Sequence, residues 1–338
     1  MAELSLDAAR LGEYLGAHID NFGTVQGVEK FAGGQSNPTY LLTTSTGGYV
    51  LRSKPPGQLL KSAHAVDREF RVIKSLAETD VPVAPALHLC EDESVTGSMF
   101  YVMGYVEGRI FWDPSLPEVE RADRAAYHEE IVRTLSAIHD VDLQAAALED
   151  YGRPGNYFDR QIGRWTKQYQ ASETSCIEPM EALMAWLPAN APAEDGETCL
   201  IHGDFRIDNL IFDPAAPRVL AVLDWELSTL GHPLADLAYL CMCMRLPDQG
   251  DVRGLGNKDR AALGVPEEAQ IVEQYCRLRN IPAIDNWPFY LAFSFFRMAS
   301  ICQGVYKRAL DGNASNKKAM QIGALVAPLA EAGLALVR

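Results

Sequence analysis

The sequence lacks an excess of positive charge. Among its 338 residues, 30 Lys and Arg stand against 45 Asp and Glu, which gives a formal net charge of −15. Such a balance repels a phosphate backbone, so we expect no nucleic-acid partner. The same charge repels an anionic small substrate, which would need local cationic side chains that the average conceals.

The N-terminal segment lacks a long apolar run. Residues 1–14 include Glu3, Asp7 and Glu13, so we expect neither a signal peptide nor a membrane span. With 48% hydrophobic and 22% charged residues, the chain is typical of a folded, soluble protein. We therefore expect a cytoplasmic location and no membrane partner.

Metal and disulfide motifs are also missing. The seven cysteines form an odd set without CxxC spacing, which favours buried free thiols. No HExxH motif accompanies His128 and His139, so packing or surface roles are favoured over zinc binding. The sequence has no internal repeat and no low-complexity segment.

The texture of the chain changes near residue 104. Before it, glycine-punctuated strand patterns (VEKFA, TYLLTT, YVLRSK and MFYVMGYV) surround one helical stretch at about 62–79. After it, a strand pair at 210–212 and 219–223 interrupts a mostly helical region. The expected helices span 119–140, 156–171, 178–187, 233–246, 266–279, 286–311 and 316–336. We predict an α+β protein with a sheet-rich lobe (1–104) and a helical lobe (105–338).

The sharpest chemical signal is the segment HGDFRIDN followed by LDWE. It contains Asp204, then Asn209 five residues later, then Asp224 beyond a predicted hairpin. In phosphotransfer kinases, an Asp at the first position accepts the hydroxyl proton, and an Asn and an Asp at the other two bind metal. A turn rich in Asp and Asn without catalytic duty is the alternative.

These motifs resemble the aminoglycoside phosphotransferase family and its choline kinase relatives. GGQSNPTYLL, YVLRSKPPG, the REF around Glu69, YVMGYVEG, QIGRWTKQY, DWELSTLGHPLADLA and QGVYKRAL are similar to the kinase-like domains fused to acyl-CoA dehydrogenases in animals. The resemblance implies a two-lobed protein kinase-like fold that binds ATP in a cleft. It also implies an activity associated with phosphorylating hydroxyacyl-CoA compounds.

The resemblance assigns roles around the motif. Asp204 would be the catalytic base, and Asn209 and Asp224 would be the Mg²⁺ ligands. His202 would be a buried brace of the loop, which Asp236 would support through backbone hydrogen bonds. His202 as the general base is an alternative, because its reference pKa lies near neutrality.

The nucleotide would be held by residues of the sheet-rich lobe. Glycines let backbone N–H groups approach phosphates, and neighbouring polar side chains can add donors; a plain hairpin turn is the alternative. The candidate phosphate loop comprises Gly33, Gly34, Gln35, Ser36 and Asn37. The adenine would meet the backbone of the strand around Met103 and Tyr105.

The strand lysine that is usual in this family is replaced. YVLRSK places Arg52 there, with Lys54 two residues later on the same side of the strand. A guanidinium can clamp phosphates and pair with a carboxylate, for which Glu69 is the expected partner. An exposed strand charge is the alternative. His232, where relatives commonly carry Asp, is interpreted as a surface change.

The acceptor would bind in the helical lobe. Arg160, Arg164 and Lys167 share one helix face, which is either a solvated surface or a basic strip for an anionic acceptor such as a CoA thioester. An aminoglycoside or another small alcohol is an alternative acceptor. A non-catalytic pseudokinase, suggested by the missing lysine, also stays open. A hydrolase using His202 is disfavoured because the sequence has no GxSxG motif. We expect the apolar C-terminal stretch to form one or two packing helices, with a dimer face as the alternative.

Overall fold

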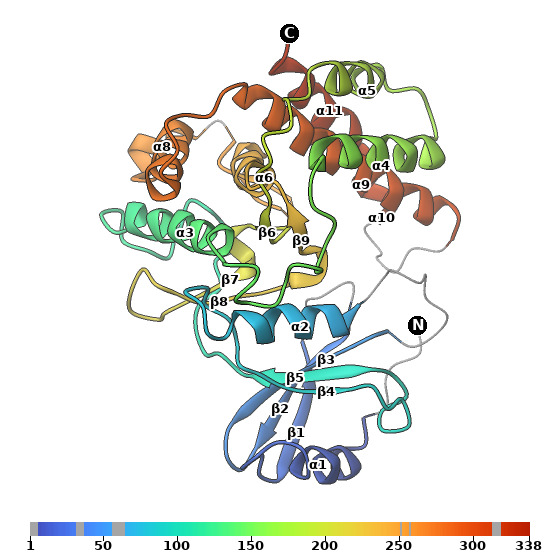
Figure 1. The fold of residues 1–338 in the computed structure, drawn as a ribbon, viewed down its shortest axis with the longest axis vertical. Helices are drawn as coiled ribbons and strands as arrows, with labels where there is room; N and C mark the ends of the chain where they lie inside the picture. Colours follow the sequence, from blue (N-terminus) through green and yellow to red (C-terminus); the bar gives the residue numbers. More distant parts are fainter. Residues whose placement is uncertain (1–5, 32–36, 56–64, 251, 257, 313–318) are drawn as a thin grey trace. The chain divides into compact units, whose positions relative to one another are not determined.

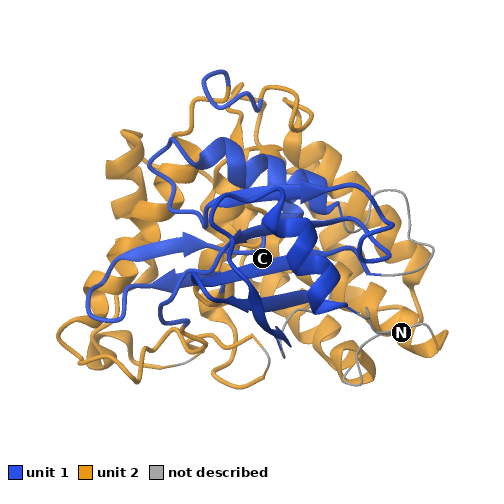
Figure 2. Cartoon of the chain, turned by 90° about the horizontal axis from the view of Figure 1, so that it is seen from below, with its two compact units in different colours: residues 1–110, 144–148, 209–228 blue, residues 111–143, 149–208, 229–338 orange. Residues whose placement is uncertain are grey.

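The computed structural model describes residues 6–31, 37–55, 65–250, 252–256, 258–312 and 319–338 (Figure 1). The chain divides into two compact units, which Figure 2 colours separately. Unit 1 comprises residues 1–110, 144–148 and 209–228, and unit 2 comprises residues 111–143, 149–208 and 229–338. No helix in the described ranges is long and apolar enough to cross a membrane.

Unit 1 is built on a five-stranded antiparallel sheet. Its strands are, in spatial order, β1 (Val25–Lys30), β2 (Thr39–Thr44), β3 (Gly48–Ser53), β5 (Phe100–Gly104) and β4 (Ala86–Cys90). Strand residues alternate between two faces. One face supplies Leu42, Leu51 and Val102 to a core that helix α1 (Ala8–Gly16) covers with Leu11 and Leu15.

Helix α2 (Val66–Leu76) packs against β4 and β5 on the other side of the sheet (Figure 1). Its buried residues are mainly apolar, but Glu69 is also only 1% exposed. Strand register places Arg52 of β3 directly opposite Tyr101 of β5, on the face that α2 covers. The alternation of β3 therefore sends Leu51 into the α1 core and Arg52 toward Glu69.

The predicted hairpin is present as β7 (Leu210–Phe212) and β8 (Val219–Val222), followed by the 3-10 turn η2 (Trp225–Leu227). Leu223 N–H donates to the carbonyl of Asn209 at 2.8 Å. Asn209 and Asp224 therefore leave the same end of one hairpin, although 15 positions separate them in sequence.

Unit 2 is mainly helical, with helix α9 (Trp287–Leu310) packed against several others. A short strand pair, β6 (Cys199–Ile201) and β9 (Thr229–Gly231), accompanies them. The 3-10 turn η1 (Ile207–Asn209) begins in this unit and ends at Asn209, which belongs to unit 1. The run LADLAYLCMCM forms most of α6 (Leu234–Arg245), in which every residue from Leu234 to Met244 is buried. The remaining helices are α3 (Arg124–His139), α4 (Tyr157–Ser172), α5 (Glu178–Ala189), α7 (Arg260–Leu263), α8 (Glu268–Arg279), α10 (Ala319–Ile322) and α11 (Val326–Ala335).

Some details differ from the sequence expectations. Helices α1 and α7 and strands β4, β6 and β9 are absent from those expectations. The helical stretch expected at 316–336 is divided by a 3-10 turn at Gly323–Leu325, where Gly323 packs so closely on Tyr306 that a Cβ would lie 2.5 Å from its ring. Six of the seven free cysteines are buried, but Cys176 is exposed.

Candidate active site

The loop after β6 is fixed by hydrogen bonds to its backbone. The carboxylate of Asp236, at the start of α6, accepts the N–H of His202 at 2.6 Å and that of Gly203 at 2.9 Å. Gly203 has a φ of +83°, which favours glycine because it has no Cβ. These contacts define the path of the chain just before Asp204.

His202 is completely buried, and its Nδ1 accepts the backbone N–H of Asp204 at 3.2 Å. This geometry favours the brace over the alternative in which His202 acts as a general base. His139, from the end of α3, lies with Nε2 at 3.5 Å from Asp236 and Nδ1 at 2.7 Å from the hydroxyl of Tyr275. Burial alone would raise the pKa of Asp236, but His139 and the backbone N–H of Gly203 hold this pKa below its ordinary value.

Two neighbours orient the carboxylate of Asp204, which is 19% exposed. The hydroxyl of Tyr239 donates to Oδ1 at 2.6 Å, and Arg206 Nε lies 3.5 Å from the same oxygen. Burial, together with the negative charge of Asp204, raises the pKa of Tyr239 well above its ordinary value, so the phenol remains a donor. Tyr239 stands one helical turn after Asp236, so α6 holds both the backbone and the side chain of this loop.

Arg297 of α9 supports the same loop from another direction. Its Nη2 donates to the carbonyl of Gly203 at 2.7 Å. The guanidinium carbon lies 5.4 Å from the ring centre of Tyr239 and 5.8 Å from that of Trp165. Sequence reasoning missed Tyr239 and Arg297, because both come from apolar helical runs that carry no motif.

In unit 1, three carboxylates surround the guanidinium of Arg52. Its Nε lies 2.8 Å from Glu69, and its Nη2 lies 2.6 Å from Asp224 and 3.6 Å from Glu226. Asn37 donates to Glu69 at 2.7 Å and to Glu226 at 3.4 Å. Arg52 thus faces the carboxylates and is not a solvated strand charge.

Glu69 is under opposing influences. Burial raises its pKa to about 7, against the effect of Arg52, which favours the charged form. The hydroxyl of Tyr101 also donates to it at 3.3 Å. Lys54 directly follows β3, and its ammonium lies 3.7 Å from Asp67 of α2.

The hairpin end offers oxygen ligands to a cation. Asp224 has a left-handed backbone (φ +64°), a conformation that is uncommon outside glycine and is concentrated at functional sites. Its carboxylate and the amide of Asn209 are hard oxygen donors, and the carboxylates around Arg52 outnumber its single positive charge. No group of three or more His, Cys, Asp or Glu in the described residues forms a complete metal cage. Mg²⁺ needs only one or two carboxylates, because phosphates and waters complete its shell, so these residues fit it.

Other predicted nucleotide contacts are placed only in part. Gly33, Gly34, Gln35 and Ser36 lie outside the described residues. Met103 is buried in β5, whereas Tyr105 is 45% exposed and its N–H donates to the carbonyl of Gly48 at 3.1 Å. The adenine contact therefore stays a prediction.

The basic residues of α4 do not line either hollow that we find in unit 2. Arg160 donates to the backbone carbonyls of Arg153 and Pro154, Arg164 lies over the ring of Trp165, and Lys167 is exposed. Their role as an acceptor strip stays a prediction.

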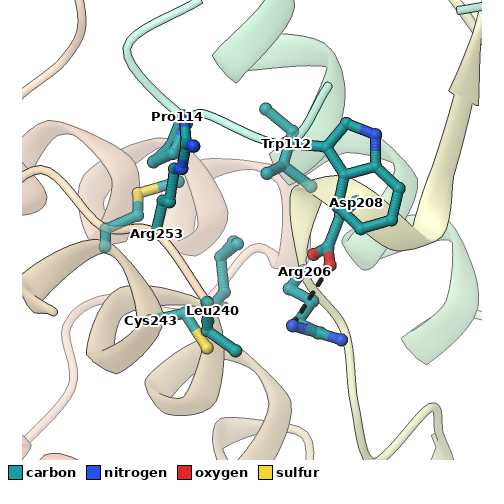
Figure 3. Close-up of a pocket in the computed structure, with 10 residues that line it drawn as sticks. Trp112, Pro114, Arg206, Asp208, Leu240, Cys243 and Arg253 are labelled. Atoms are coloured by element: carbon teal, nitrogen blue, oxygen red, sulfur yellow. Dashed lines mark ion pairs between the residues drawn. The ribbon is translucent and has the colours of Figure 1, made fainter. Parts of the chain in front are cut away.

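A hollow of about 360 Å³, including its open mouth, lies next to the loop (Figure 3). Leu240 and Cys243 of α6 give it an apolar side, and Trp112 and Arg253 also line it. Arg206, which contacts Asp204, contributes an ion pair with Asp208 at 3.1 Å. Arg206 and Asp208 belong to the HGDFRIDN segment, but no sequence pattern indicated that the other lining residues would meet them.

The interpretation of His232 as a surface change is wrong. The residue is only 9% exposed, and its ring stacks on Tyr290 and packs against Phe158. Its Nε2 lies 3.2 Å from Asp195. The imidazole therefore packs within an aromatic cluster and also contacts a carboxylate.

The sequence profile of the phosphotransferase enzyme family (APH) matches residues 27–271. The chain belongs to this family. This phosphotransferase is 52% identical over 303 residues to mouse acyl-CoA dehydrogenase family member 10, covering 89% of this chain and 28% of that protein. It is 45% identical to rat acyl-CoA dehydrogenase family member 11, covering 98% of this chain and 43% of that protein. The chain thus spans less than half the length of these relatives.

Solved structures confirm the α+β, kinase-like fold of this phosphotransferase. A Ralstonia eutropha JMP134 protein, described as a candidate aminoglycoside phosphotransferase, superposes with a TM-score of 0.89 at 49% identity over 98% of both chains. Aminoglycoside phosphotransferase APH(4)-Ia, solved as a mutant with ADP and hygromycin B, gives a TM-score of 0.65 at 16% identity, over 97% of this chain and 98% of that one.

Proposed function

We propose that this phosphotransferase moves the γ-phosphoryl group of ATP, with Mg²⁺, to a hydroxyl of a small molecule, and that the acceptor is of the hydroxyacyl-CoA type. The observation that carries the proposal is the orientation and partial exposure of the Asp204 carboxylate. Its carboxylate is partly exposed, held on one oxygen by Tyr239, and set on a loop whose backbone Asp236 fixes. A pre-oriented carboxylate is what proton abstraction from a hydroxyl requires.

The residues of unit 1 supply the electrostatic part of the proposal. Asn209 and Asp224 would hold Mg²⁺, which neutralises charge on the triphosphate when it is bound. Arg52 carries the positive charge that the family usually places on a lysine, and Glu69 orients its guanidinium from α2. The forked guanidinium can keep Glu69 with one edge and turn the other toward a phosphate.

The acceptor class is supported by the relatives. The matching parts of the acyl-CoA dehydrogenase family members 10 and 11 share 44–52% identity with this chain. Those proteins are named for chemistry on acyl-CoA compounds, so a hydroxyl on such a compound is a consistent acceptor. An aminoglycoside is the second candidate, because the Ralstonia protein that covers 98% of this chain carries that description.

The test is a transfer assay with purified protein, Mg²⁺ and ATP radiolabelled at the γ-phosphoryl group. The acceptors would be a series of hydroxyacyl-CoA thioesters, a panel of aminoglycosides, and choline. We expect labelled product with at least one hydroxyacyl-CoA and none without Mg²⁺. Transfer only to aminoglycosides would overturn the acceptor class. Binding of Mg·ATP without transfer to any hydroxyl would instead support a pseudokinase.

A further inference from the structure

Arg297 carries a charge that no carboxylate of the described residues balances in a salt bridge. The residue is 7% exposed, and its hydrogen bond within the described residues goes to the carbonyl of Gly203. It forms no salt bridge with any residue in the described part of the chain. An arginine side chain stays charged in proteins, and a buried charge without a counter-ion is costly. A neutral amide could donate the same hydrogen bond, so the structure of the loop does not explain the charge.

The surroundings of Arg297 contain a second unused donor. The guanidinium lies over the faces of Tyr239 and Trp165, and cation–π attraction offsets part of its desolvation. The indole Nε1 of Trp165 is buried and has no hydrogen-bond partner among the described residues. A buried cation and a buried N–H donor that both lack an anionic partner have the chemistry of an anion-binding site.

Arg297 lies beside the candidate base. Arg297 holds Gly203, whose neighbour in sequence is Asp204. One ring links the two groups, because Tyr239 presents its face to the guanidinium and donates its hydroxyl to Asp204. All these residues belong to unit 2.

We propose that Arg297, assisted by the indole N–H of Trp165, binds an anionic group of the acceptor, either a carboxylate or a phosphate. The inference rests on the proposed function and narrows it to acceptors that carry both a hydroxyl and a negative charge. Asp204 takes the hydroxyl proton as the hydroxyl oxygen bonds to the γ-phosphorus, and the bond from that phosphorus to the bridging oxygen breaks to release ADP. A polycationic aminoglycoside would be repelled by Arg297.

The first experiment measures anion binding without turnover. Sulfate would be titrated into the protein saturated with Mg·ADP, and the unfolding temperature compared with that in sodium chloride of equal ionic strength. We expect a saturable rise in the wild type, because a ligand that binds only the folded state stabilises it. Arg297→Gln keeps a donor for Gly203 and should lose the rise. Arg245→Gln removes an arginine that is paired with Glu268 and should keep it.

The second experiment identifies the anion. One hydroxy acid would be offered as the free acid, the CoA thioester and the neutral N-acetylcysteamine thioester. We expect the wild type to prefer an anionic form, so that its kcat/KM is higher for that form than for the neutral thioester. In Arg297→Gln the ratio of these two kcat/KM values should fall by about ten-fold or more. A preference for the free acid identifies a carboxylate, and a preference for the CoA ester identifies a phosphate. The KM for ATP should not change.

Each outcome is decisive. Sulfate binding that depends on Arg297, without transfer to any acceptor, would overturn the proposed function and leave the anion site standing. Transfer with an unchanged preference in Arg297→Gln would overturn the anion site alone. The anion site would also be overturned if Arg297→Gln weakened the binding of Mg·AMP-PNP but not that of Mg·ADP. In that case Arg297 would bind the phosphoryl group that is transferred and not the acceptor. If Arg297→Gln does not fold, the sulfate titration is carried out on the wild type and on Arg297→Lys, which keeps the charge. We expect a saturable rise in the unfolding temperature of both proteins. The absence of this rise in the wild type refutes the inference.

Discussion

Replacing Asp236 by Asn should destabilise the fold strongly for a single-atom change. The carboxylate accepts two backbone N–H groups, at 2.6 Å and 2.9 Å, in a fully buried position. Hydrogen bonds to a charged group contribute about 1.5–3 kcal/mol each, and Asn keeps only one acceptor oxygen while turning an NH₂ toward a donor. We expect a loss of about 3 kcal/mol at pH 7 in urea unfolding.

The pH dependence of this loss has a defined sign. Because the pKa of Asp236 is lowered in the folded protein, its contribution is present above the pKa of the unfolded chain and disappears as the pH falls through the folded value. The difference between wild type and Asp236→Asn should therefore narrow below about pH 4. Asp311→Asn, which breaks an exposed pair with Lys307, should cost less than about 1 kcal/mol. The reasoning would be refuted if Asp236→Asn lost no more free energy of unfolding at pH 7 than Asp311→Asn does. It would also be refuted if the difference in this free energy between wild type and Asp236→Asn increased in acid.

Two further changes test the neighbours of the site. Tyr239→Phe keeps the ring beneath the guanidinium but removes the donor to Asp204, so kcat should fall about ten-fold or more while the Kd of Mg·ATP stays constant; unchanged kcat would remove Tyr239 from this role. Arg52→Met leaves Glu69 buried without its counter-charge and should cost about 3 kcal/mol at pH 8, measured by urea unfolding. That cost should be smaller at pH 6, because neutralising a carboxyl whose pKa is already about 7 becomes easier; a larger cost at pH 6 would contradict the ion-pair interpretation.

Local patterns were sufficient to predict much of the fold. The strand alternation in TYLLTT and YVLRSK predicts that Arg52 and Leu51 lie on opposite faces of the sheet. The spacing of HGDFRIDN and LDWE locates the loop and the hairpin. These features depend on periodicity and turns within short stretches, which sequence records directly. The short elements α1, β4, β6, β9 and α7 carry weak periodic signals, because each spans too few residues to show a clear repeat.

The residues that complete the site could not be predicted, because their roles depend on packing between distant segments. Tyr239 and Arg297 are 58 positions apart and meet only when α6 and α9 pack together. Glu226 follows the expected Asp224, but its place beside Arg52 depends on the left-handed turn at Asp224. His232 shows the same limit, because its burial is created by aromatic residues from other helices.

The central claim is that Asp204 is the base of a phosphoryl transfer from ATP to a hydroxyl. The direct measurement compares wild type and Asp204→Asn in γ-phosphoryl transfer to the best hydroxyacyl-CoA acceptor, with Mg·ATP affinity measured by calorimetry on both. We predict a loss of transfer of about 100-fold or more with nearly unchanged nucleotide binding. Transfer by Asp204→Asn at the wild-type rate would contradict the claim.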